Sequence, residues 1–211
     1  KKLAEKLGIN QSTAVTCVKP SGTVSQLVDA ASGIHARHNP YYIRTVRGDN
    51  KDPLTMFLQD KGVPSEPDFT APDNVTVFSF PMKSPDSAVC RYDMGALAQL
   101  ELWLKIADNY CEHKPSVTIS VQEHEWLEVG AWCWEHFDSL SGISFLPFSD
   151  HSYKQAPYQD IDKETFKDLT EKMPPAIDWY ELANYEKGDT TTGSQELACA
   201  GGVCEIVDIG A

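Results

Sequence analysis

The turn Lys19-Pro20-Ser21-Gly22-Thr23-Val24-Ser25-Gln26 joins a predicted strand to a predicted helix. The strand is residues 13–18, which are rich in β-branched side chains, and the helix is residues 23–30. A helix begins with backbone N–H groups that lack partners and with a partial positive charge, so its start favours a phosphate ligand. Small residues let a phosphate approach the backbone, and the hydroxyls of Ser21, Thr23 and Ser25 add donors.

An ordinary strand-to-helix turn capped by a hydroxyl is the competing interpretation, because the Gly-Lys-Thr/Ser ending of a Walker loop is missing. The charge distribution slightly favours the phosphate site. The chain has 18 basic against 31 acidic residues, a net charge of −13, yet residues 1–61 hold 9 basic and 5 acidic residues. The acidic balance argues against nucleic-acid or anionic-membrane partners, and any phosphate-bearing ligand is expected near the first 61 residues.

Strands and helices alternate along the chain, which indicates an α/β fold and favours parallel pairing of the strands. Asp52 and Pro53 open one helix as N-cap and first residue, and Gly62 ends it. The further predicted strands are residues 41–46, 75–80, 116–121 and 142–148. The further predicted helices are residues 92–110 (the longest), one with Trp126, Cys133 and Phe137 on its inner face, one opened by Asp162, and a last helical stretch ending near Tyr185.

The composition is that of a globular protein. The chain has 211 residues, 41% hydrophobic and 23% charged, enough for one domain with a core or two small ones. It has no run of about 18 apolar residues, as a membrane span needs, and no secretory signal at its start. The first residue is not Met, which suggests a piece of a longer protein. We expect a cytoplasmic protein without a membrane partner.

The end of the chain differs in character from the rest. Residues 188–194 contain no apolar side chain, and no aromatic residue follows Tyr185. We predict a folded body at residues 1–185 and a flexible tail at residues 186–211. The tail carries Cys199 and Cys204 on either side of Gly201-Gly202, a hinge that lets two thiols meet without strain.

Three interpretations of the tail cysteines remain open: a redox-active dithiol, an incidental pair of exposed thiols, and a metal site. A disulfide that closes a short exposed loop suits exchange better than stabilisation. Zinc would need four ligands, and no second Cys or His pair lies near, so we predict no metal site. The single cysteines are expected to be buried small hydrophobic residues; they are Cys17, Cys90, Cys111 and Cys133.

Several segments together resemble the large subunits of ribonucleotide reductases, and the variant is similar to the adenosylcobalamin-dependent (class II) enzymes. The resemblance covers nearly the whole chain and rests on Lys19 to Gln26, Ser32-Gly33-Ile34-His35, Tyr41-Tyr42-Ile43-Arg44, Lys114-Pro115-Ser116-Val117-Thr118, Ser141-Gly142-Ile143-Ser144-Phe145-Leu146-Pro147, and Cys199 to Cys204. The diiron-partnered class I large subunit is the alternative within this family. Class I relies on an adjacent tyrosine pair near its last barrel strand, where this chain has residues 145–148 without tyrosine.

The resemblance implies the C-terminal part of a ten-stranded α/β barrel with a flexible C-terminal tail. The enzyme would reduce ribonucleotides to deoxyribonucleotides by thiyl-radical chemistry, for DNA synthesis. Ser21, Gly22, Thr23, Val24 and Ser25 would bind the substrate phosphates. The dithiol of Cys199 and Cys204 would reduce the active-site disulfide, and a thioredoxin-like protein would then reduce the dithiol.

The same resemblance places other parts of the enzyme outside this chain. Adenosylcobalamin would be bound mainly elsewhere, and the radical cysteine and active-site disulfide would lie upstream of Lys1 in the same polypeptide. The piece alone is therefore expected to be inactive. The alternative of a different class is a thiol-redox interaction module, an acidic α/β domain with a dithiol arm and no nucleotide site.

Two further motifs were considered as functional sites. His124-Glu125-Trp126-Leu127-Glu128 is a near miss of the zinc-protease helix motif, and we expect it to be an exposed helix face. His35, Arg37 and His38 follow the phosphate-loop candidate. They either face a nucleotide or belong to an ordinary loop.

Overall fold

The computed structural model describes residues 1–22, 24–148 and 154–187. The chain forms two compact units, each built from two stretches of sequence. The first unit comprises Lys1–Arg44 and Pro81–Asp168, and the second comprises Thr45–Phe80 and Leu169–Ala211. The predicted tail lies outside the described residues from residue 188 onward, so its boundary at residue 186 stays a prediction.

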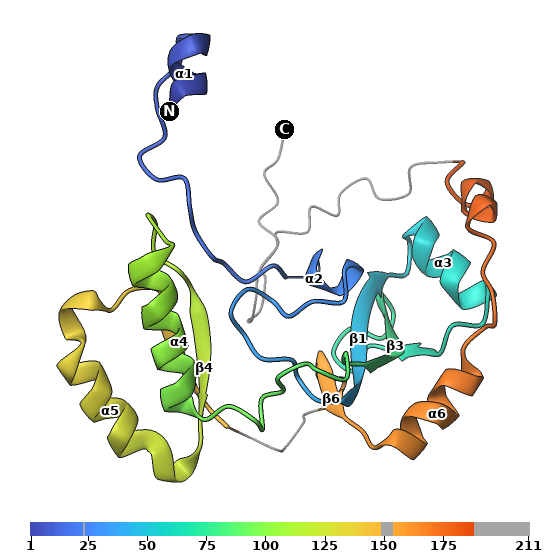
Figure 1. The fold of residues 1–211 in the computed structure, drawn as a ribbon. Coiled ribbons are helices and arrows are strands. Elements are labelled where there is room, and N and C mark those ends of the chain that lie inside the picture. Colours follow the sequence, from blue (N-terminus) through green and yellow to red (C-terminus); the bar gives the residue numbers. More distant parts are fainter. Residues whose placement is uncertain (23, 149–153, 188–211) are drawn as a thin grey trace. The chain divides into compact units, whose positions relative to one another are not determined.

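Helices and strands follow one another along the described chain (Figure 1). In order they are α1 (Lys2–Leu7), α2 (Val24–Leu27), β1 (Tyr41–Asp49), α3 (Pro53–Asp60), β2 (Ser65–Pro67), β3 (Val75–Lys83), α4 (Ala96–Asn109), β4 (Val117–Val121), the 3₁₀ helix η1 (Glu123–Glu125), α5 (Trp126–Glu135), the 3₁₀ helix η2 (Phe137–Ser139), β5 (Ile143–Pro147), β6 (Tyr158–Asp160), α6 (Lys163–Lys172) and the 3₁₀ helix η3 (Trp179–Asn184). The predicted elements at residues 41–46, 75–80, 92–110, 116–121 and 142–148 are confirmed as β1, β3, α4, β4 and β5. The three-residue strands β2 and β6 and the short helix α1 were not predicted.

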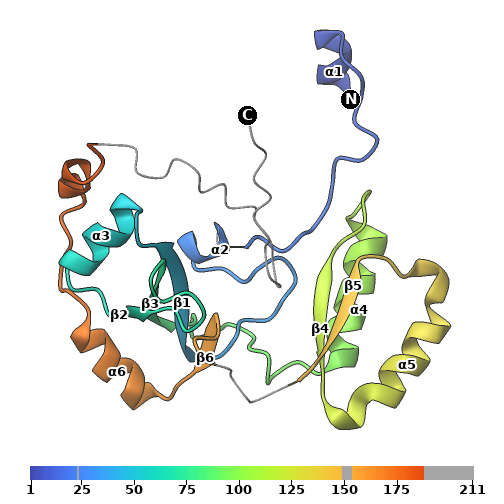
Figure 2. The same cartoon turned by 180° about the vertical axis from the view of Figure 1, so that it is seen from behind.

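The core of the first unit lies between α4 and the parallel pair β4–β5 (Figures 1 and 2). The strands align from Val117 opposite Ile143 to Val121 opposite Pro147, which confirms the parallel pairing expected here. Leu100 and Trp103 of α4 are fully buried in this core. Their spacing of three residues places both on one face of α4.

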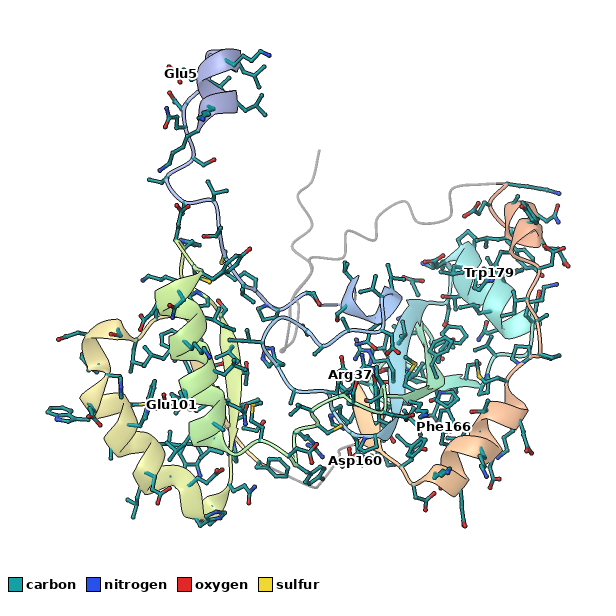
Figure 3. All side chains as sticks on the ribbon, in the orientation of Figure 1. Glu5, Arg37, Glu101, Asp160, Phe166 and Trp179 are labelled. Atoms are coloured by element: carbon teal, nitrogen blue, oxygen red, sulfur yellow. The ribbon has the colours of Figure 1, made fainter. Side chains whose placement is uncertain are left out.

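The inner face of α5 differs from the prediction. Val129 and Trp132 are the buried residues of this helix, whereas Trp126 is 38% and Phe137 is 69% exposed. The indole N–H of Trp132 donates to the carboxylate of Glu101 on α4 at 2.6 Å (Figure 3). A buried indole needs such an acceptor, and this contact sets the rotation of α5 against α4.

The remaining strands form a sheet of order β2-β3-β1-β6. Two strand pairs in this sheet are antiparallel, whereas parallel pairing was expected. β1 pairs antiparallel with β6 within the first unit, and β2 pairs antiparallel with β3 within the second. The connection from β2 to β3 is too short for the crossover that a parallel pair requires. The strands of the described residues form these two open sheets, so they do not close a barrel.

Residues 13–18 form no strand, which corrects the prediction. They lie along residues 112–116: the N–H of His113 donates to the carbonyl of Thr16 at 3.1 Å, and the N–H of Ser116 donates to that of Val18 at 3.1 Å. These two bonds are three residues apart on one segment and two apart on the other, so the ladder is irregular. Pro115 lies between the two donors. Because proline has no backbone N–H, it cannot donate to a regular ladder at this point.

The second unit has its own apolar core around Phe57 of α3, which is fully buried. Asp52 caps α3 as predicted, because its carboxylate accepts from the N–H of Leu54 at 2.8 Å. The Phe57 ring lies 5.7 Å from that of Trp179 and 5.4 Å from that of Tyr185. The last helical stretch is therefore present, but it is the 3₁₀ helix η3.

The helix opened by Asp162 is confirmed as α6. The carboxylate of Asp162 accepts from the N–H of Thr165 at 2.7 Å, as an N-cap does. In the part of the chain that the structure describes, no helix is long and apolar enough to cross a membrane.

Candidate functional site

The helix after the Ser21 turn is shorter than predicted. Of the described residues 24–30, Val24–Leu27 are helical, and Asp29 takes a left-handed φ of 49° that stops the helix. Gly22 has a φ of 61°, which suits glycine and turns the chain sharply before α2. A single helical turn carries little macrodipole, so a phosphate here would depend on the local N–H and hydroxyl groups. Thr23 lies outside the described residues.

Ser25 is the best-defined candidate ligand in this segment. Its residue is 5% exposed, and its hydroxyl has no hydrogen-bond partner in the structure. A buried hydroxyl without a partner costs free energy, so such a group in a native protein requires an explanation. A bound ligand that takes up the hydroxyl is one such explanation, and it agrees with the predicted role of Ser25.

Ser21 is fixed by a second turn, at residues 32–35. The backbone N–H of Ser21 donates to the hydroxyl oxygen of Ser32 at 2.9 Å, and the two hydroxyl oxygens lie 3.3 Å apart. Gly33 has a φ of 60°, and a Cβ at this position would lie 2.8 Å from the carbonyl oxygen of Lys19. Only glycine therefore allows the second turn to pack against the first.

A cavity of about 340 Å³ lies between Pro20, the residue before Ser21, and the starts of β4 and β5. Hydroxyl groups line it: the side chains of Thr118 and Ser144 lie 2.9 Å apart, and the ammonium of Lys19 donates to the hydroxyl of Ser116 at 2.7 Å. Pro20, Ser141 and Gly142 complete most of the wall. Three segments that the sequence resemblance singled out separately, at residues 19–26, 114–118 and 141–147, thus meet at one cavity.

The wall of this cavity requires a second glycine. A Cβ on Gly142 would lie 2.5 Å from the carbonyl oxygen of Pro115 and 2.9 Å from the hydroxyl of Ser116. The Pro115 carbonyl also accepts from the indole N–H of Trp103 at 3.3 Å. The cavity is therefore attached directly to the apolar core below it.

The chain was compared with known proteins, and no family model matches it. It is 27% identical to an adenosylcobalamin-dependent ribonucleoside-triphosphate reductase of Lactobacillus acidophilus, over 98% of this chain and 28% of that protein. It is 33% identical to the enzyme of the same description from Euglena gracilis, over 81% of this chain and 24% of that protein. The crystal structure of a B12-dependent (class II) ribonucleotide reductase matches with a TM-score of 0.73 and 27% identity, over 89% of this chain and 26% of that one.

The chain is homologous to class II ribonucleotide reductases. The resemblance recognised from the sequence is thereby confirmed. The chain spans only about a quarter of the length of these class II relatives. The open sheets of the described residues are consistent with this, since a barrel needs strands from the rest of such a protein.

The guanidinium of Arg37 (labelled in Figure 3) is occupied by partners within the chain. The residue is 5% exposed. The guanidinium donates to the carboxylate of Asp29 at 2.8 Å, to the carbonyl of Ala30 at 2.9 Å and to the hydroxyl of Tyr42 at 3.1 Å. Of the two interpretations for this segment, the structural loop holds for Arg37.

His38 belongs to a different polar cluster, around Asp160 of β6. Burial, and to a smaller extent the positive charge of Arg91, lowers the pKa of His38 to about 4. Its ring is therefore neutral at pH 7, and Nε2–H donates to the Asp160 carboxylate at 2.7 Å as a hydrogen bond rather than as an ion pair. Arg91 and the hydroxyl of Tyr92 donate to the other carboxylate oxygen at 2.7 and 2.8 Å.

The cysteines in the described residues are free thiols. Cys90 is buried, and burial raises the pKa of its thiol; burial also raises the pKa of Cys133. Cys17, Cys111 and Cys133 are only half-buried, so the expectation of burial is confirmed for Cys90 alone. The residues of the predicted tail dithiol, Cys199 and Cys204, lie outside the described residues.

Sequence reasoning missed several residues of the cavity. Ser116, Thr118 and Ser144 line it but were quoted only as parts of motifs, without a role. The exposed face predicted for residues 124–128 is found for His124, Trp126, Leu127 and Glu128. No group of three His, Cys, Asp or Glu side chains that could hold a metal ion occurs within residues 1–22, 24–148 and 154–187.

Proposed function

We propose that this chain is the C-terminal part of an adenosylcobalamin-dependent ribonucleotide reductase and that it supplies the substrate phosphate site. The observation that carries the proposal is a hydroxyl-lined cavity at the starts of β4 and β5 whose wall also includes Pro20, the residue before Ser21, in a chain homologous to class II enzymes. Small polar walls and backbone N–H groups suit a phosphate, which accepts hydrogen bonds at all its oxygens.

The proposed ligands are Ser21, Gly22, Thr23, Val24 and Ser25, with Lys19 as the positive charge. The ammonium of Lys19 already lies against the hydroxyl of Ser116 on the cavity wall. The buried hydroxyl of Ser25 is available because it has no partner in the structure. The relatives are described as triphosphate reductases, so a ribonucleoside triphosphate is the first substrate to test and a diphosphate the second.

Adenosylcobalamin fits neither of two cavities among the described residues. They measure about 340 and 480 Å³, the size for a drug-sized ligand and not for a corrinoid with its nucleotide arm. We therefore assign cofactor binding to the rest of the polypeptide, together with the radical chemistry. The 211-residue piece alone is expected not to turn over.

The proposed task of the tail is thiol–disulfide exchange. Cys199 and Cys204 would give two electrons and two protons to the active-site disulfide and become a disulfide themselves. A thioredoxin-like dithiol would return the electrons and protons in the same way. The support for this role is the spacing of the two cysteines across Gly201-Gly202. A cytoplasmic location, where such reductants operate, belongs to the same proposal.

The test is an activity assay of the intact parent protein with adenosylcobalamin and a ribonucleoside triphosphate. Wild type and Cys199→Ser are each driven by thioredoxin and by a small dithiol, with Cys111→Ser as the matched control. We expect Cys199→Ser to lose activity with thioredoxin and to keep it with the small dithiol. Equal loss or equal retention with both reductants contradicts the shuttle, and no cobalamin-dependent turnover of wild type favours class I or the non-enzymatic module.

A further inference from the structure

His35 joins the two walls of the proposed phosphate site through both of its ring nitrogens. The backbone N–H of Thr118 on β4 donates to Nε2 at 3.0 Å, and Nδ1 lies 2.7 Å from the carbonyl oxygen of Ser32. Residues 35 and 118 are 83 positions apart in the sequence. The ring therefore connects the second turn, which fixes Ser21, to the strand that carries the cavity hydroxyls.

These contacts determine which nitrogen carries the proton. The N–H of Thr118 can only donate, so Nε2 must offer a lone pair and carry no proton. The Ser32 carbonyl can only accept, so Nδ1 must carry the hydrogen. The network thus assigns His35 as the neutral tautomer protonated at Nδ1, with one acceptor and one donor used.

The strand geometry explains why β4 needs this partner. In a parallel pair, alternate residues of a strand direct their N–H and carbonyl groups to the neighbour. The N–H of Val117 donates to the carbonyl of Gly142 beside β5, at 3.0 Å, so the N–H of the next residue, Thr118, lies on the open edge. His35 satisfies that N–H where a further strand would otherwise do so.

The connection continues from His35 to the candidate phosphate ligands. Ser32 accepts from His35 through its carbonyl and from the N–H of Ser21 through its hydroxyl, at 2.9 Å. The same carbonyl also accepts from the N–H of His35 at 3.1 Å, which closes the turn. Strand β4, His35, Ser32 and Ser21 therefore form one hydrogen-bonded series along the edge of the cavity.

We infer that His35 is a positioning residue for the phosphate site: it holds the Ser21 turn at a set distance from the hydroxyls of β4 and β5. This inference rests on the proposed function. His35 lines a separate cavity of about 480 Å³ and is not among the residues that line the 340 Å³ cavity. It therefore acts on that cavity through Ser32 and Ser21, whose neighbour Pro20 is part of the wall, rather than on the substrate. Loss of the imidazole leaves the Thr118 N–H without its acceptor and removes one of the two hydrogen bonds to the Ser32 carbonyl, so that the turn and β4 can move apart.

The two bonds of the ring can be tested separately. In His35→Asn the side-chain amide nitrogen can take the place of Nδ1 and keep the bond to Ser32, while the acceptor for Thr118 is lost. In His35→Gln the amide oxygen can take the place of Nε2 and accept from Thr118, while the donor to Ser32 is lost. Ser32→Ala removes only the hydroxyl that accepts from Ser21. His124→Ala removes an exposed imidazole elsewhere and is the matched control.

The experiment measures kcat and KM of the intact protein for a ribonucleoside triphosphate, together with the equilibrium Kd of that nucleotide. We expect His35→Ala to raise KM and Kd roughly tenfold or more, and kcat to change less, because the ligands remain but are misplaced. Asn and Gln variants should each recover part of the affinity, and Ser32→Ala should raise KM by a smaller factor, about threefold. His124→Ala should match wild type.

The outcomes separate this inference from the proposed function. If wild type neither binds nor reduces the nucleotide, the proposed function is overturned, and the inference with it. If wild type is active and both His35→Ala and Ser32→Ala keep KM and Kd within twofold of wild type, only the positioning role is overturned. Should His35→Ala fail to fold, Ser32→Ala decides in the same way, because it removes one hydroxyl of a half-buried residue and leaves the turn carbonyl in place.

Discussion

The core beneath α4 and the turns at residues 19–35 lie in the same unit, yet different forces hold them. Leu100, Trp103 and Ile119 are fully buried, and the core is built from their apolar area. The turns bury little apolar surface and depend on hydrogen bonds between residues far apart in sequence, such as Thr118 with His35. The core beneath α4 stabilises the unit. The turns at residues 19–35 can present polar groups to a ligand, because few of their N–H and carbonyl groups are paired in a helix or a sheet.

The second unit shows that a polar network is not by itself a site. Asp68 accepts from the N–H and hydroxyl of Thr70, the N–H of Ala71 and the guanidinium of Arg47, within 2.6–3.1 Å. These bonds use both oxygens of a carboxylate that is 5% exposed. A filled network of this kind ties a loop down, whereas the Ser21 region leaves the Ser25 hydroxyl unpartnered.

The largest effect is expected in the apolar core. Trp103→Ala should lower the free energy of unfolding of the first unit by about 3–5 kcal/mol, because it removes a fully buried indole and its hydrogen bond to Pro115. Urea unfolding of the intact protein, with hydrogen exchange of α4 as the local readout, measures this loss. A change below about 1 kcal/mol would show that the core is not built as described.

A smaller loss of stability, with a larger loss of binding, is expected in the turns. Gly33→Ala combines a left-handed φ with a Cβ 2.8 Å from the Lys19 carbonyl, and should cost about 1–3 kcal/mol and raise the nucleotide KM. Gly62→Ala is the matched control, since Gly62 has a φ of 77° but open space around its Cβ position. Its nucleotide KM should equal that of wild type. Equal KM values for the two variants would contradict the role of the 32–35 turn.

The filled network at Asp68 should respond to pH. Hydrogen bonds, above all from the Thr70 hydroxyl, hold the pKa of Asp68 far below its usual value. The resulting stability is fully present above about pH 4, the ordinary pKa of aspartate, and is lost as the pH falls further towards the lowered pKa. Asp68→Asn should cost about 1–2 kcal/mol at pH 7 and flatten the acid limb of stability against pH. If Asp68→Asn lost stability at acid pH in the same way as wild type, the account of this network would be wrong. The variant should bind the nucleotide as wild type does.

The smallest effect is expected at an exposed tryptophan. Trp134 on α5 is 83% exposed, so Trp134→Ala should change the free energy of unfolding by less than about 0.5 kcal/mol. Measured beside Trp103→Ala, it separates the loss of burial from the loss of an indole as such. A destabilisation above about 1 kcal/mol would show that another part of the intact protein covers this face of α5.

The sequence was sufficient for the parts of the fold that local rules control. The apolar spacing in α4 and the Asp52-Pro53 start of α3 are short-range signals, and both elements were predicted. The antiparallel partners β2 and β6 were missed because three residues carry no readable periodicity. Residues 13–18 have the composition of a strand, but their partner contains Pro115, and no property of residues 13–18 themselves reveals that.

In the candidate site too, features that depend on neighbouring residues were predicted, and features that depend on distant residues were not. The Ser21 turn was predicted as a phosphate site from its small hydroxyl residues and from family resemblance. The role that we propose for His35 was not predicted, because its ring accepts from the N–H of Thr118, 83 residues away. The partnerless state of the Ser25 hydroxyl likewise depends on what packs around it. Hydrogen bonds between distant residues are the part of a site that a single sequence does not show.

The most direct test is hydrogen exchange at the backbone amides of residues 21–25 in the intact protein, with and without a saturating ribonucleoside triphosphate. The phosphate site predicts that the nucleotide slows exchange at these amides and leaves the amides of α3 unchanged. If the nucleotide is turned over while exchange at residues 21–25 stays the same, the phosphates are bound elsewhere and the central claim is wrong.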